Sequence, residues 1–178
     1  MTLRALRAGV SAWALLAGLG AAMAGEISDD RVTIGVLTDM SGIYSAASGE
    51  GVVDAVKMAV ADYGGTVAGK KITVVAADHQ NKTDVGAAIA AKWFDADGVD
   101  VIVDVPNSAV ALAVQDLAKN RNRVFIGGGA VTSDLTGKAC SPNGVQYIYD
   151  TYSMAATAAK GAANASLSQV NRGQPGRS

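Results

Sequence analysis

The sequence predicts an α/β domain built on a doubly wound parallel sheet with the strand order 2-1-3-4-5. Short apolar runs alternate with amphipathic stretches from residue 31 onward. The third apolar run, 99–103, is almost continuously hydrophobic, which is typical of a parallel strand buried on both faces. Alternating strands and helices of these lengths connect through right-handed crossovers, which place helices on both faces of the sheet.

Each element follows from a local pattern. Apolar residues recur at helical spacing from Val52 to Tyr63, and two glycines follow this first helix. Asp84 and Ser108 stand where N-caps of the second and third helices are expected, and a weaker helix starts at Thr151. The five strands are predicted at 32–37, 71–77, 99–103, 123–126 and 145–149.

The first 24 residues are predicted to be a secretory signal peptide. Arg4 and Arg7 precede the uncharged run 8–25, and Ala22 and Ala24 supply small residues at the −3 and −1 positions of a cleavage site. An uncleaved membrane anchor is the alternative. Residues 25–160 are then expected to form one α/β unit, interpreted below as a ligand-binding lobe, and 161–178, which have no apolar period, to form a disordered tail. Export places the mature protein outside the cytoplasm, and the family resemblance described below implies the periplasm.

Composition argues against the common catalytic and nucleic-acid-binding classes. The 178 residues contain one Cys and one His, which exclude a disulfide framework and a Cys-rich metal site and disfavour a Ser-His-Asp or zinc enzyme. A net charge of −1 supplies no basic excess for nucleic acid. No G-x-G-x-x-G, G-K-[ST] or G-x-S-x-G motif occurs at the required place. We therefore expect no catalysis, cofactor or metal.

The predicted order places a switch point between the first and third strands, where ligands of doubly wound sheets bind. Three loops rich in small residues face it: 39–45, 105–109 and 127–133. The helix starting at Ser108 would favour an anionic group such as a carboxylate, and the hydroxyls of Ser108 and Thr132 can add hydrogen bonds. The alternatives are that Ser108 is only an N-cap and that the glycines at 127–129 serve tight turns alone.

For the other candidate residues, a structural role is at least as well supported as a functional one. Tyr44 can stack on a ligand or be a partly exposed structural residue, and His79 follows the second strand in a polar loop. Trp93 is expected in the core. Asp39 and Asp104, at strand ends, can form a carboxylate pair, although capping or solvation is the preferred interpretation.

Five runs of the sequence together resemble one family. They are 32–42 (VTIGVLTDMSG), 69–72 (GKKI), 78–82 (DHQNK), 104–108 (DVPNS) and 132–137 (TSDLTG). In this order they are similar to the type I periplasmic substrate-binding proteins of ABC transporters, of the branched-chain amino acid (Leu/Ile/Val-binding) type. The resemblance covers about residues 30 to 160.

The resemblance implies a solute-binding protein that captures an amino acid or another small organic acid and delivers it to an ABC permease in the inner membrane. The family closes two α/β lobes over its ligand. By motif, Ser108, with its neighbour Asn107, contacts the ligand carboxylate, and Ala130 and Thr132 hold the ammonium and carboxylate. Tyr44 covers the ligand, and Tyr152 forms part of the wall. A monomer is expected.

The sequence departs from the family in one respect: it resembles the N-terminal lobe alone, and no second lobe is recognisable. The expectation is therefore a truncated product with impaired binding, in which Cys140 has lost a potential partner. Two other functions remain open: a ligand-sensing domain of a receptor, and a small flavodoxin-like nucleotide binder. The specific ligand cannot be read from the residues.

Overall fold

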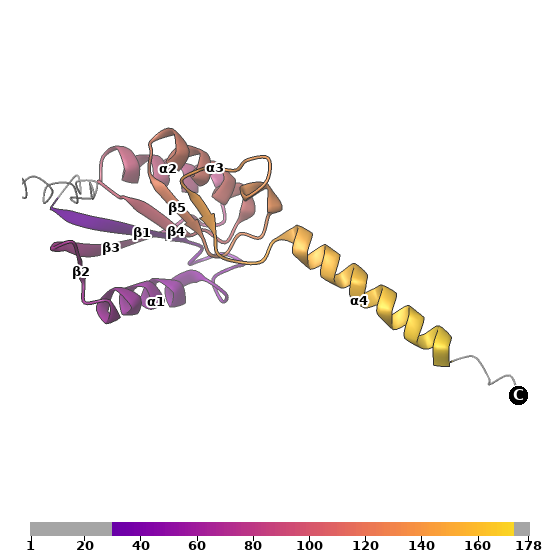
Figure 1. Ribbon diagram of the computed structural model, residues 1–178. Helices are drawn as coiled ribbons and strands as arrows, with labels where there is room; N and C mark the ends of the chain where they lie inside the picture. Colours follow the sequence, from indigo (N-terminus) through magenta and orange to yellow (C-terminus); the bar gives the residue numbers. More distant parts are fainter. Residues whose placement is uncertain (1–29, 173–178) are drawn as a thin grey trace, which may run out of the picture.

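The computed structural model describes residues 30–172, with side chains to residue 165, as one sheet flanked by helices (Figure 1). The strands are β1 (Arg31–Thr38), β2 (Thr66–Val67), β3 (Lys70–Asp78), β4 (Val101–Asp104), β5 (Val124–Gly127) and β6 (Gly144–Gln146). The helices are α1 (Gly49–Asp62), α2 (Thr83–Asp95), α3 (Ser108–Asn120), the short 3-10 turn η1 (Ser133–Leu135) and α4 (Thr151–Arg172).

The sheet confirms the predicted class and strand order. Its six strands are arranged β2-β3-β1-β4-β5-β6, and the five predicted strands pair in parallel. The additional strand, β2, is two residues long and pairs antiparallel with the start of β3. Such a short edge strand has no hydrophobic period that a sequence pattern could reveal.

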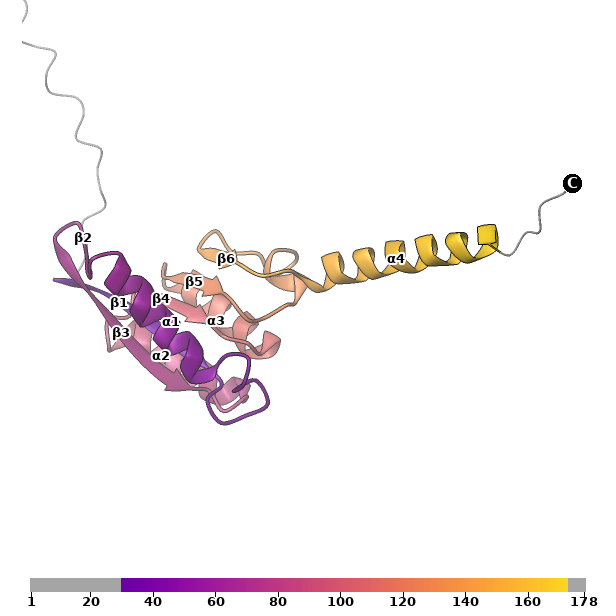
Figure 2. The same ribbon diagram turned by 90° about the horizontal axis from the view of Figure 1, so that it is seen from below.

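Helices α2 and α3 pack on one face of the sheet and enclose the core (Figures 1 and 2). Trp93 is 8% exposed, as expected for a core residue, and lies so close to Gly35 that a Cβ there would meet its ring at 2.6 Å. Gly35 therefore allows α2 to approach the central strand closely. Helix α1 lies on the opposite face, against β1 and β3.

Two local expectations differ from the structure. Asp84 does not cap α2: the N-cap is Lys82, no side chain caps this helix, and Asp84 lies in the first turn. Helix α4 continues to Arg172, across much of the segment 161–178 in which a disordered tail was expected. Alanine is the strongest helix former, and the segment 155–165 is rich in it, so local propensity extends the helix without an apolar period.

The predicted signal peptide, 1–24, lies outside the described residues. Within residues 30–172, no helix has both the length and the hydrophobicity needed to cross a membrane.

Candidate functional site

The candidate site lies at the carboxyl edge of the sheet, between the ends of β1 and β4. These strands are neighbours, yet β1 leads into α1 on one face while β4 leads into α3 on the other. This divergence opens a crevice at the strand ends, which is the usual ligand position in doubly wound sheets. The structure thus brings the predicted loops 39–45, 105–109 and 127–133 to one edge of the sheet.

The chain leaves β4 through a strained backbone. Asp104 and Val105 both adopt left-handed conformations, with φ of 80° and 56°, and Val105 is fully buried. The Val105 N–H donates to Leu37 O at 3.0 Å, and the Gly128 N–H donates to Asp104 O at 3.1 Å. These bonds hold a β-branched residue in a disfavoured conformation, as is common where a backbone is shaped for binding.

Aspartates at the ends of β1 and β3 organise the loop that follows β1. The buried Asp39 carboxylate accepts hydrogen bonds from the Gly42 and Tyr44 N–H groups at 2.8 and 3.0 Å. The Asp78 carboxylate accepts from the Met40 N–H at 3.0 Å and from the Ser41 hydroxyl at 2.6 Å. Burial raises the pKa of Asp78, but these donors and the Gln80 N–H outweigh it and hold this pKa below its ordinary value.

The Asp104 carboxylate ties β4 to the start of α1. The Ser48 hydroxyl donates to Asp104, so the hydroxyl of Thr38, 2.8 Å from that of Ser48, must donate to Ser48. Thr38 in turn accepts the Gly49 N–H at 2.9 Å. Asp39 and Asp104 therefore do not act as a carboxylate pair: Asp39 holds the first part of the loop after β1, and Asp104 holds the end of the same loop at Ser48.

Asn107, and not Ser108, caps α3. The Asn107 side-chain oxygen accepts from the Ala109 and Val110 N–H groups at 2.8 and 3.1 Å, and its amide donates to Asn81 at 2.6 Å. Ser108 is therefore the first helical residue and not the cap. Within residues 30–172, neither the N–H nor the hydroxyl of the half-buried Ser108 has a hydrogen-bond partner.

The loop after β5 packs directly onto the loop after β4. A Cβ at Gly129 would lie 2.7 Å from Pro106 Cα, so only glycine permits this approach. Ala130 is fully buried, and its carbonyl accepts from the Gln146 side chain at 3.0 Å. The Thr132 hydroxyl accepts from the Asp134 N–H at 3.3 Å as the cap of η1.

The two predicted aromatic residues lie in different settings. Tyr44 is half-buried in the loop after β1, and its main chain bonds to Asp39, Ala47 and Ser48. Tyr152 is 75% exposed in the first turn of α4. The preceding Thr151 joins α4 to the β5 loop, because its N–H donates to Val131 O at 2.8 Å and its hydroxyl donates to Ser133 at 3.2 Å.

His79, which the sequence places in a polar loop after a strand, is fully buried. Its Nδ1 accepts from the Asn81 N–H at 3.0 Å, so the neutral ring carries its proton on Nε2, which has no partner within the described residues. Burial lowers the pKa of His79, although the Asp39, Asp78 and Asp104 carboxylates act in the opposite direction. Contacts made by the chain beyond this loop bury it, and no local signal predicts them.

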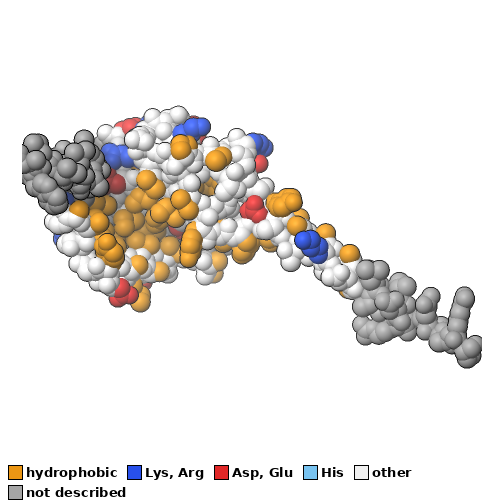
Figure 3. Space-filling model, viewed as in Figure 1, with side chains coloured by type: hydrophobic (Ala, Val, Ile, Leu, Met, Phe, Trp, Pro, Cys, Tyr) orange, Lys and Arg blue, Asp and Glu red, His pale blue; other side chains and the backbone are white. Residues whose placement is uncertain are grey.

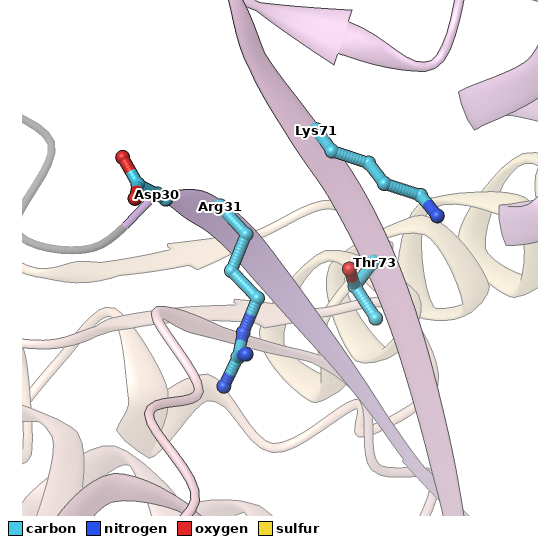
Figure 4. A pocket seen from close by; sticks show the side chains of 4 residues that line it. All are labelled: Asp30, Arg31, Lys71 and Thr73. Carbon is cyan, nitrogen blue, oxygen red and sulfur yellow. The ribbon is translucent and has the colours of Figure 1, made fainter.

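A separate hollow of about 490 Å³ lies at the amino end of β1 and β3, away from the site, and is lined by Asp30, Arg31, Lys71 and Thr73 (Figure 4). Across residues 30–172, no group of three His, Cys, Asp or Glu residues is placed to hold a metal ion.

Comparison with known proteins finds one family and several solved structures. Residues 31–169 match the family described as periplasmic binding protein. A periplasmic binding protein from Burkholderia mallei is 49% identical, with a TM-score of 0.67 over 68% of this chain and 32% of that one. A branched-chain amino acid ABC transporter periplasmic ligand-binding protein from Burkholderia xenovorans is 42% identical, with a TM-score of 0.68 over 74% and 36% of the two chains.

A third structure shows a bound molecule. It is a solute-binding protein of an ABC transporter from Rhodopseudomonas palustris in complex with 3,4-dihydroxybenzoic acid, 30% identical, with a TM-score of 0.63 over 68% of this chain and 33% of that one. The chain thus spans about a third of the length of these structures. No curated protein sequence matches the chain.

Proposed function

The chain belongs to the periplasmic binding protein family, and on this basis we propose that it is the N-terminal lobe of a solute-binding component of an ABC importer. Its ligand is a small organic carboxylate, either a branched-chain amino acid or an aromatic acid. The similar protein from Burkholderia xenovorans is a periplasmic ligand-binding protein of a branched-chain amino acid ABC transporter. The similar protein from Rhodopseudomonas palustris is in complex with 3,4-dihydroxybenzoic acid. We propose no catalytic step.

The observation that carries this proposal is the free donor pair on Ser108. Because Asn107 satisfies the next two amides of α3, the Ser108 N–H and hydroxyl are the donors that the helix start leaves for a ligand. The positive end of the α3 dipole strengthens both toward an anion. A carboxylate with one oxygen on each donor would lie in the crevice between β1 and β4.

The surrounding loops would hold the rest of the ligand. The Ala130 N–H and the Thr132 hydroxyl belong to the loop that packs on Pro106, beside the start of α3. Tyr44, in the loop fixed by Asp39, supplies an aromatic side chain on the β1 side. Tyr152 is the outermost wall residue that we propose, given its exposure on α4.

This lobe covers the ligand from one side. Its polar groups are preorganised by hydrogen bonds within the lobe, but water retains access to the other side of a bound carboxylate, which weakens each hydrogen bond. We therefore propose weak binding by this chain. Export by the segment 1–24, a periplasmic location and delivery to an inner-membrane permease complete the proposal.

A thermal-shift screen tests the ligand class and the strength of binding. The purified chain is heated with L-leucine, L-isoleucine, L-valine, benzoate and 3,4-dihydroxybenzoate, with leucinamide as the matched control that lacks the carboxylate. We expect small rises in Tm with the carboxylates at high concentration and none with leucinamide. A rise of several degrees at micromolar ligand would contradict weak one-sided binding, and an equal rise with leucinamide would contradict carboxylate recognition.

A further inference from the structure

Three aspartates stand at strand ends on the carboxyl edge of the sheet, and one of them is short of hydrogen-bond donors. Asp39 follows β1, Asp78 ends β3 and Asp104 ends β4. Asp39 accepts from two main-chain N–H groups, and Asp78 accepts from two N–H groups and the Ser41 hydroxyl. Asp104 accepts from the Ser48 hydroxyl, through Oδ2. Among the residues that the structure describes, no donor reaches Asp104 Oδ1.

Asp104 Oδ1 lies deep in the crevice but remains accessible. The residue is 6% exposed. Within the described residues, the side-chain atoms that are fully buried without a hydrogen-bond partner are His79 Nε2 and Gln146 Oε1, so Asp104 Oδ1 keeps contact with solvent. It lies beside the loop after β5, because a Cβ at Gly129 would meet it at 3.2 Å and a Cβ at Gly128 at 3.7 Å. The two glycines therefore leave this oxygen open to a small molecule.

No cation of the described residues pairs with this carboxylate. Their ion pairs join Lys and Arg side chains to other aspartates. Through Ser48 the Asp104 side chain reaches the face of the sheet on which α1 lies, where hydrophobic side chains gather and Lys and Arg side chains lie outside that area (Figure 3). A carboxylate removed from bulk water is stabilised by donors or a cation, so Asp104 Oδ1 is a strong acceptor with unused capacity.

A buried chain of hydroxyl groups fixes the orientation of Asp104. The Thr38 hydroxyl lies 2.8 Å from the Ser48 hydroxyl and donates to it, so the Ser48 proton is directed to Asp104 Oδ2. Thr38 is held in turn by the Gly49 N–H, which donates to it at 2.9 Å. The carboxylate cannot turn away without breaking this chain. Its free oxygen is therefore preorganised before a ligand arrives, which lowers the entropic cost of binding.

We propose that Asp104 determines which carboxylic acids this lobe accepts: the ligand carries a hydrogen-bond donor, an ammonium or a hydroxyl group, that binds Asp104 Oδ1. The inference rests on the proposed function, in which the ligand carboxylate binds Ser108. Asp104 ends β4, and Ser108 begins the helix into which β4 leads. The crevice then offers donors to the ligand carboxylate at Ser108 and an acceptor to the second polar group at Asp104.

The charge of Asp104 also acts against acids that lack such a donor. Two carboxylates in one crevice repel each other, and partial exclusion of water strengthens the repulsion. A ligand donor on Oδ1 offsets this repulsion, most of all when the donor is itself charged. We therefore expect L-leucine to bind more tightly than 4-methylpentanoate, which is leucine without its ammonium group. In the same way, 3,4-dihydroxybenzoate is expected to bind more tightly than benzoate if the donor is a hydroxyl.

Titration of the ¹⁵N-labelled chain with these two pairs of acids, followed by NMR, tests the inference. In at least one pair the donor-bearing acid is expected to bind roughly fivefold more tightly or better. The pair that shows the preference identifies the donor as an ammonium or a hydroxyl group. Equal affinities within both pairs overturn the inference but leave carboxylate binding, and with it the proposed function, in place. If none of the four acids gives saturable shifts, the proposed function and this inference are both wrong.

Asp104→Asn assigns the preference to this side chain. The amide keeps the size of the residue and an oxygen for the Ser48 hydroxyl, but it carries no charge and turns an N–H group toward the ligand. We expect the preference within the pair to disappear. Asp116→Asn is the matched control, because it removes the same charge from an exposed position on α3 and should retain the preference. Circular dichroism verifies the fold of both variants, and if Asp104→Asn is unfolded the comparison of acids on the parent chain still decides. A folded Asp104→Asn variant with the full preference overturns the inference.

Discussion

Ser108 is the residue on which the proposed site depends most. Its neighbour Asn107 occupies the capping position of α3, so the serine hydroxyl has no hydrogen-bond partner among the described residues. A sequence pattern of Asn-Ser at a helix start fits a cap at either residue, so the sequence alone kept the capping and binding roles of Ser108 open. The side-chain geometry shows that Asn107 is the cap. Ligand binding is therefore the role that we propose for Ser108.

Replacing Ser108 with alanine is expected to weaken carboxylate binding without affecting stability. A hydrogen bond to a charged group contributes about 1.5–3 kcal/mol, so affinity should fall roughly tenfold or more. Thr83→Ala is the control, because Thr83 is likewise the first residue of a helix, α2, but follows β3, on the other side of β1 from the crevice. Ligand titration followed by NMR measures both variants. Equal losses of affinity for the two variants would contradict the role of Ser108.

His79 gives the lobe a pH-dependent stability. Burial lowers its pKa below the ordinary value of 6.5, so the unfolded chain binds the proton more readily than the folded chain does. The contribution of His79 to the free energy of unfolding is therefore fully present above pH 6.5. It is lost as the pH falls from 6.5 toward the lower pKa that His79 has in the folded chain. The loss is at most about 1.4 kcal/mol per pH unit.

His79→Asn removes this dependence while keeping an acceptor for the Asn81 N–H. Urea unfolding at about pH 7.5 and about pH 5.5, on either side of the ordinary histidine pKa, should show a smaller stability change for the variant than for the parent chain. The sequence contains one His, so no other imidazole contributes. The lowered pKa of Asp78 acts below 3.8 and is separated from this range. An identical pH dependence in the two proteins would show that His79 is not the cause.

At the scale of elements, the strand-end loops are positioned by close contacts that hydrophobic periodicity does not report. The predicted strands 32–37 and 71–77 lie within β1 and β3. A strand in a parallel sheet needs apolar residues along its length, and this requirement can be read from the sequence. The left-handed Asp104–Val105 pair and the burial of His79 depend instead on bonds between loops that are distant in sequence. Strand order was thus predictable from the sequence, while the detailed shape of the crevice was not.

Two adjacent glycines test the packing of the β5 loop on the β4 loop. Gly129→Ala would bring a Cβ to 2.7 Å from Pro106 Cα, whereas Gly128→Ala would meet Asp104 Cα at 3.6 Å, an ordinary contact. We expect Gly129→Ala to destabilise the fold by about 1–3 kcal/mol and Gly128→Ala to have little effect. Urea denaturation gives both values. Equal stabilities would mean that the two loops are not in tight contact.

At the scale of the whole molecule, the carboxyl edge of the sheet is the region that presents donors to a small anion. The loops after β1, β4 and β5 and the start of α3, which are distant in sequence, meet at this edge. Tyr152 of α4 lies beyond them as the outermost residue of the proposed site.

The central claim is that this lobe recognises a carboxylate at the crevice between β1 and β4. Titrating the ¹⁵N-labelled chain with L-leucine and with benzoate, while recording amide chemical shifts, tests it most directly. The account predicts saturable shifts at high ligand concentration, concentrated at Ser108, Ala130 and Thr132 and in the loop around Tyr44, and their loss in Ser108→Ala. Shifts concentrated at the amino end, around Arg31 and Lys71, or no shifts with either carboxylate, would contradict it.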